Sequence, residues 1–70
     1  MGEKLWFISE DNEPVAVFDS KVQAVDEKAS LANDNEDADY RVYSLTIEDL
    51  EENSGDYEEE YDLALQEGYF

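Results

Sequence analysis

After Arg41 this chain carries ten carboxylates and no basic residue, and that imbalance constrains the fold more than any other feature. All ten lie between Glu48 and Glu67, and the last basic residue before them is Arg41. Over its 70 residues the chain has 21 acids against four bases, a formal net charge of -17. Because each added charge increases self-repulsion in a compact state, any fold must keep these acids on its surface and hold them there with a core.

The aromatic residues indicate that such a core exists. High charge with low hydropathy is typical of disordered chains. Here, however, the aromatic residues make up 13% of the chain and lie in segments with readable hydrophobic periodicity, which disordered acidic tails lack. We therefore expect residues 1–70 to form a single acidic domain, of a size at which buried apolar area barely offsets chain entropy.

The hydrophobic pattern predicts an α+β domain, a small antiparallel three-stranded sheet covered on one face by two helices, in the order β-β-α-β-α. Residues 4–9 and 14–18 favour an extended backbone and enclose turn-forming residues, so they predict a hairpin. Residues 40–47 alternate in hydropathy and predict the third strand. Residues 46–50 could open a short helical turn before the second helix.

Capping residues and apolar spacing predict the two helices. Ser20 and Gln23 form a capping-box pattern that starts the first helix at Lys21, and the second is expected from about Asp56, with Gly68 as its C-terminal cap. Apolar spacings of three and four residues predict the faces that meet the sheet. These faces are Val22, Val25, Ala29 and Ala32 in the first helix, and Tyr57, Tyr61, Ala64 and Leu65 in the second.

The residue types that the chain lacks exclude most catalytic chemistry. It has no cysteine and no histidine, which are the commonest nucleophiles, general bases and transition-metal ligands. We therefore expect no enzymatic activity, no disulfide and no cofactor. Residues 34–45 supply oxygen ligands, but Asp39 and Leu45 stand where an EF-hand requires Gly and Glu, so we expect no calcium site.

No segment has the pattern of a targeting or membrane-spanning element. The apolar run of residues 5–8 is too short for a signal peptide, and no stretch reaches the ~20 apolar residues of a membrane-spanning helix. The net charge also repels anionic lipid and nucleic acid. We expect a cytoplasmic protein that binds neither membrane nor nucleic acid directly.

The acids of the second half are spaced closely enough to imitate a nucleic-acid backbone. Helical residues three or four apart lie about 5–6 Å apart at Cβ, and duplex DNA presents one phosphate per roughly 3.4 Å of axis on each strand. A DNA-binding cleft meets a similar potential in both, and the binding weakens steeply with salt because counterions are released. The acids expected to contact a partner are Glu48, Asp49, Glu51, Glu52, Asp56, Glu58, Glu59 and Glu60.

Two other interpretations of these acids remain open. A charge run is most often a solvated face, although no Lys or Arg stands at the neutralising i,i+4 positions after Arg41. Halophilic adaptation also selects dense surface acid and sparse lysine. A salt titration of stability distinguishes it from mimicry.

The order of the segments resembles that of small phage proteins. The run EPVAVFDSK from Glu13, the capped helix after it and the run YRVY from Tyr40 carry this likeness, which spans residues 5–50. With its excess of acid, the chain resembles phage-encoded small acidic DNA-mimic proteins, among them the host-takeover inhibitor of the nucleoid protein HU from large lytic Bacillus phages. The resemblance implies a protein of the host cytoplasm that blocks DNA binding by HU. It brings no catalytic motif.

The aromatic residues support a different class of function. Tyr69 and Phe70 lie beyond the expected cap, so we expect an exposed contact or the seam of a homodimer there, whereas Trp6, Tyr57 and Tyr61 are expected in the core. In this interpretation an interaction module binds a host enzyme such as RNA polymerase, and the acid serves only for solubility.

A third interpretation again relies on the acids. In it the protein inhibits uracil-DNA glycosylase or a nuclease by placing its anionic surface in the DNA-binding cleft of that enzyme.

Overall fold

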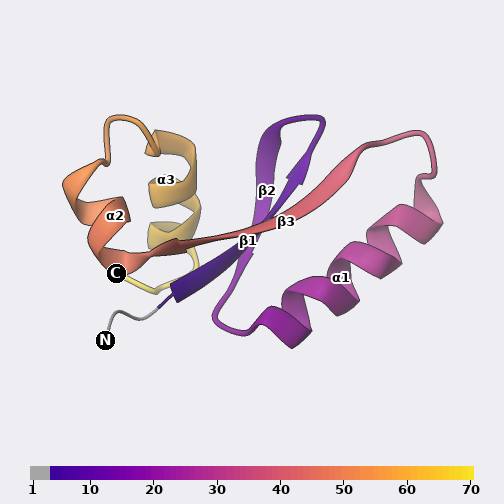
Figure 1. Cartoon of the computed structure of the whole chain (residues 1–70), viewed down its shortest axis with the longest axis horizontal. Helices are drawn as coiled ribbons and strands as arrows, with labels where there is room; N and C mark the ends of the chain where they lie inside the picture. The colour runs from indigo at the N-terminus through magenta and orange to yellow at the C-terminus, as the bar shows by residue number, and fades with distance from the viewer. Residues whose placement is uncertain (1–3) are drawn as a thin grey trace.

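The structure, a computed structural model, describes residues 4–70 and follows the order β-β-α-β-α-α (Figure 1). The single domain predicted over residues 1–70 includes residues 1–3, which lie outside the described residues. The elements are β1 (Lys4–Glu10), β2 (Glu13–Phe18), α1 (Lys21–Asp34), β3 (Tyr40–Thr46), α2 (Ile47–Glu52) and α3 (Glu58–Gln66). The predicted α+β class is confirmed, and the helical turn expected at residues 46–50 adds α2 to the two helices predicted.

The three strands form an antiparallel sheet in the order β2-β1-β3. Asp11 and Asn12 join β1 to β2 in a two-residue turn, with φ angles of 52° and 71°. These are the left-handed conformations that a tight hairpin turn requires and that Asp and Asn tolerate. β1 is central and alternates its side chains between the two faces, so Leu5 and Phe7 share one face while Trp6 and Ile8 share the other.

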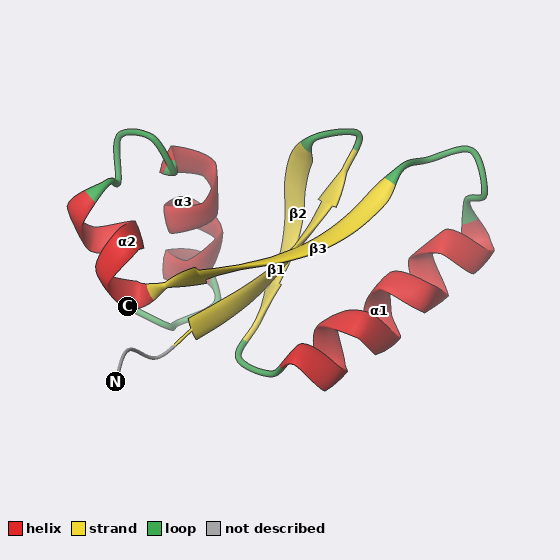
Figure 2. Cartoon of the chain, viewed as in Figure 1, coloured by secondary structure: helices red, strands yellow, loops and turns green. Residues whose placement is uncertain are grey.

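Helices cover both faces of this sheet, and the prediction that they cover a single face is wrong. α1 lies on the side of Trp6 and Ile8, and the Lys21 ammonium at its start is 5.6 Å from the centroid of the Trp6 ring. α2 and α3 lie on the opposite side (Figures 1 and 2), where they pack against Leu5 and Phe7. The physical reason is that β1 is apolar on both faces, so helices on one side alone would leave the other apolar face in water.

The main core lies between the sheet and the α2–α3 pair. Phe7, Leu50 and Ala64 are fully buried at its centre, and the Phe7 ring stacks on Tyr43 with centroids 5.6 Å apart. Partly buried side chains surround this centre: Leu45, Ile47, Tyr57, Tyr61, Leu63 and Tyr69. Tyr57 and Tyr61 therefore belong to the core, as predicted, and Trp6 is half-buried on the other face of the sheet.

α1 begins at Lys21 as predicted but turns a different face to the sheet. Ala24 is fully buried, whereas Val22 is 70% exposed and Val25 is 45% exposed. Only two residues connect β2 to α1, and so short a connection fixes which side of the helix meets the sheet irrespective of hydropathy. Ser20 occupies the N-cap position, but its side chain makes no capping hydrogen bond, so the predicted capping box is absent.

α3 ends at the predicted glycine cap. Gly68 has a φ of 86°, and the Tyr69 N–H donates a hydrogen bond to the Ala64 carbonyl over 2.9 Å, which closes the last turn in the usual glycine-terminated manner. The predicted inward face is wrong at Leu65, which is 50% exposed. Its neighbour Ala64 occupies the position nearest the sheet, and one step along a helix rotates a side chain about 100° away.

Candidate partner-binding surface

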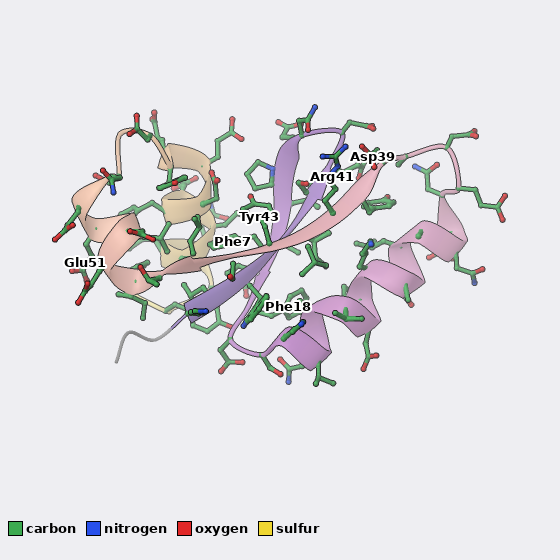
Figure 3. All side chains as sticks on the ribbon, in the orientation of Figure 1. Phe7, Phe18, Asp39, Arg41, Tyr43 and Glu51 are labelled. Atoms are coloured by element: carbon green, nitrogen blue, oxygen red, sulfur yellow. The ribbon has the colours of Figure 1, made fainter. Side chains whose placement is uncertain are left out.

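α2 places four of the predicted acids at one end of the molecule. The Thr46 hydroxyl caps the helix by accepting a hydrogen bond from the Asp49 N–H over 3.0 Å. Leu50 is fully buried beneath the helix and thereby turns the remaining side chains outward. The acids that it leaves exposed are Glu48, Asp49, Glu51 and Glu52. Figure 3 shows Glu51 at this end, far along the longest axis from Asp39.

The first turn of α3 and the connection before it hold the other four acids. Asp56 lies in the connection, and Glu58, Glu59 and Glu60 form the first turn of α3, where the helix dipole favours negative charge. Glu60 is half-buried, while the other three are exposed. We refer to all eight acids, on residues 48–60, as the acidic face.

No cation pairs with the acidic face in the part of the chain that the structure describes. The single ion pair found between residues 4 and 70 joins Arg41 Nη2 to Asp39 Oδ2 over 3.2 Å, with both side chains exposed. Figure 3 shows Arg41 beside Asp39 and well away from Glu51. Within residues 4–70, the eight acids of the acidic face therefore form no ion pair.

A groove of about 610 Å³ separates part of the acidic face from the hairpin. Four acids of the acidic face line this groove together with Tyr43, the basic residue Arg41 and residues of the hairpin; the four acids are Asp56, Glu58, Glu59 and Glu60. Burial raises the pKa of Tyr43 far above its usual value, and the Glu60 carboxylate raises it further. The Tyr43 phenol is therefore neutral at physiological pH and adds no charge to the groove.

Acids far apart in the sequence also meet at the other end of the sheet, where no prediction placed them. The Asp11 N–H donates to the Asp39 carbonyl over 2.9 Å, and the Asp39 N–H donates to Asp11 Oδ1 over 3.1 Å. The Tyr40 hydroxyl donates to Glu10 Oε2 over 3.3 Å. These pairs are 28 and 30 residues apart, so only the register of β1 with β3 brings them together, and no local pattern reveals them.

The aromatic residues after α3 are less free than predicted. Tyr69 is half-buried and packs against the main core, and this burial raises the pKa of its phenol. The expectation that Tyr69 forms an exposed contact is wrong, because the glycine cap turns the chain back toward the sheet. Phe70 is 37% exposed and stacks on Tyr61 with ring centroids 4.9 Å apart.

Within residues 4–70, no three or more His, Cys, Asp or Glu side chains are arranged to hold a metal ion. None of the helices in that range is both long and apolar enough to span a membrane. The chain matches no protein-family model, no curated protein and no solved structure.

Proposed function

We propose that this protein is a non-enzymatic DNA mimic that occupies the basic DNA-binding surface of a host protein, with the nucleoid protein HU as the first candidate. The observation that carries the proposal is the acidic face itself. Eight carboxylates occupy one short segment, seven of them are exposed, and no basic side chain lies among them. A protein groove that binds phosphate meets a comparable density of negative charge.

The core beneath the acidic face supports the proposal because it holds the charges in place. Leu50 and Ala64 are fully buried under the two helices that carry the acids, so the array does not behave as a flexible tail. A fixed array of charge binds with a smaller loss of conformational entropy than a disordered one. Release of ions from both partners then drives association and makes it sensitive to salt.

The acidic face covers only one end of the molecule, whose longest dimension is 35 Å. It therefore suits a partner that grips less than one turn of B-DNA, which spans roughly 34–36 Å. HU-type proteins insert Arg and Lys into the minor groove and bend the duplex. An acidic face of this size competes for the same cationic side chains, and the clefts of uracil-DNA glycosylase or a nuclease serve as further targets for the same test.

The test is a gel-shift competition between HU, a short DNA duplex and this protein at low salt. We expect excess wild-type protein to displace the DNA. A variant with Glu51→Gln, Glu52→Gln, Glu58→Gln and Glu59→Gln removes four exposed charges from the acidic face. We expect it to compete at least about fourfold less well, given ~0.2–1 kcal/mol for each exposed ion pair.

A matched control separates the acidic face from net charge. Asp26→Asn, Glu27→Gln, Asp34→Asn and Glu36→Gln also remove four exposed acids, but from α1 and the loop after it. We expect this control to compete nearly as well as wild type. If both variants lose the same ability to compete with DNA, the effect is one of net charge and not of the acidic face. If the wild type fails to displace DNA from HU and from the further targets, the proposal is refuted.

A further inference from the structure

Two exposed apolar side chains, Leu65 and Phe70, lie beside the half-buried Tyr61 of α3, close to the acidic face. Leu65 is 50% exposed and Phe70 is 37% exposed. The Phe70 ring stacks on Tyr61 with centroids 4.9 Å apart and planes 24° apart. We call Tyr61, Leu65 and Phe70 the aromatic patch.

The aromatic patch borders a hollow whose polar lining is entirely anionic. Tyr61 and Leu65 line a depression of about 610 Å³, and its remaining walls are Glu58, Glu59 and Asp62. Glu58 and Glu59 belong to the acidic face. The patch and the acidic face are therefore continuous, and a partner that covers one of them reaches the other.

The packing of this chain does not explain the exposed position of Leu65 on α3. Ala64 already fills the position of α3 nearest the sheet with a fully buried side chain. Phe70 lies beyond the Gly68 cap and returns to stack on Tyr61 rather than extending into water. Single exposed apolar residues are ordinary. Here, however, Leu65 shares an acid-lined depression with Tyr61, and Phe70 stacks on that same Tyr61.

We propose that the aromatic patch binds an apolar side chain on a cationic amphipathic helix of the partner, in which that side chain is flanked by Lys or Arg. The anionic rim supplies the charge complementarity, and it disfavours a second copy of a chain that carries a net charge of -17. This inference rests on the proposed function in taking the acidic face as the side that meets the partner. It adds that the contact is mixed, with salt-sensitive attraction from the acids and a salt-resistant anchor from the patch.

This division of roles determines which basic proteins are selected. Charge attraction alone draws in any cationic surface, whereas a pocket for an apolar side chain discriminates between partners of equal charge. Full burial of a leucine-sized side chain contributes about 1.5–3 kcal/mol, which corresponds to at least about a tenfold preference.

The test uses two synthetic helical peptides of equal length and charge, one with lysine and leucine on opposite faces and one with glutamine in place of each leucine. Calorimetric titration at low and high salt measures both affinities. We expect the wild type to prefer the leucine peptide at least about tenfold. The variant Leu65→Gln with Phe70→Ser is expected to lose this preference while keeping its affinity for the glutamine peptide and the salt dependence of that affinity.

Val22→Gln with Val25→Gln is the matched control, because it removes two exposed apolar side chains from α1. We expect it to leave the preference unchanged. Equal affinity of the wild type for both peptides overturns the patch while leaving the acidic face intact. Failure to bind either peptide at low salt refutes the proposed function as well. A dimer in light scattering that dissociates when Leu65 and Phe70 are replaced identifies the patch as a self-interface, and this result also overturns the inference.

Discussion

The two helical layers of this small protein, α1 on one face of the sheet and the α2–α3 pair on the other, differ in charge and in burial. The α2–α3 layer carries more net charge and also buries more of its side chains. α1 carries two lysines and three acids over 14 residues, yet Ala24 is its single buried side chain and two of its valines are exposed. Residues 47–67, which include α2 and α3, carry ten acids and no base. Beneath them Leu50 and Ala64 are fully buried in the main core.

The comparison teaches that the strongest charge is carried by the better anchored layer. Like charges this close repel one another, so a segment of this composition alone would favour an expanded chain. Burial of Leu50 and stacking of the surrounding aromatic rings offset that repulsion. α1 needs no such anchoring, because its own charges nearly cancel.

The largest expected effect comes from removing the anchor of the acidic layer. Leu50→Ala should lower the free energy of unfolding by about 2–5 kcal/mol, because it leaves a cavity in the main core. Leu31→Ala, at a half-buried position of α1, should cost only about 1 kcal/mol. Urea unfolding followed by circular dichroism measures both. Equal losses would contradict the difference in anchoring.

Ionisation of Tyr43 gives the next largest effect, above pH 10. Burial and Glu60 raise the pKa of Tyr43 in the folded state, so the unfolded chain loses this proton first and stability falls as the pH rises above the ordinary value of about 10. At pH 11 the loss attributable to this residue is at most about 1.4 kcal/mol, because solvent partly screens the half-buried phenol. Tyr43→Phe should remove that part of the pH dependence. The free energy of unfolding is measured at pH 9 and pH 11 for the wild type and for Tyr43→Phe. An equal decrease in both proteins would show that folding does not raise the pKa of Tyr43.

Neutralising the end of α2 should stabilise the protein by a smaller amount. Glu51 and Glu52 occupy the last turn of α2, where no basic residue is present and where the helix dipole disfavours negative charge. Glu51→Gln with Glu52→Gln should raise the free energy of unfolding by about 0.5–1 kcal/mol at low salt. This gain should shrink toward 1 M salt, where the Debye length is only about 3 Å.

A control for that variant lies in α1. Asp34→Asn also removes an acid from a last helical turn, but in the layer that carries two lysines, so a smaller gain is expected. A halophile-type domain would behave differently, because its wild type would continue to gain stability in molar salt after screening is complete. Thermal melts over a salt series distinguish the two.

The smallest effect is expected at the exposed ion pair outside the acidic face. Arg41 and Asp39 are 68% and 59% exposed, so solvent screens their attraction. Arg41→Gln should change the free energy of unfolding by no more than about 0.5 kcal/mol. A loss above 1 kcal/mol in the same urea assay would mean that the pair supports the contact between the β1–β2 turn and the start of β3.

The sequence predicts the elements well because their signals are local. β1 is apolar on both faces, the residues at Asp11 and Asn12 favour a turn, and Gly68 permits the left-handed cap that ends α3. The exposure of the acids is equally predictable, because charge requires solvent. The strands, the turn and the helix cap that local sequence patterns predict are present in the structure.

The errors concern how the elements face one another. Val22 and Val25 give α1 an apolar stripe in sequence, but the short connection from β2 turns Ala24 toward the sheet instead. Tyr69 was expected to be exposed because it follows a cap, and yet it returns to the core. The meeting of Asp11 with Asp39 depends on strand register across 28 residues. Each of these is a tertiary constraint that no short window of sequence contains.

The most direct measurement is a map of amide chemical-shift changes in this protein as HU is titrated into it at low salt. If the acidic face acts in place of a nucleic-acid backbone, the shifts will concentrate in residues 47–70 and disappear at high salt, while α1 stays unperturbed. Shifts that concentrate on α1, or that spread evenly over the acids at both ends of the molecule, would contradict it.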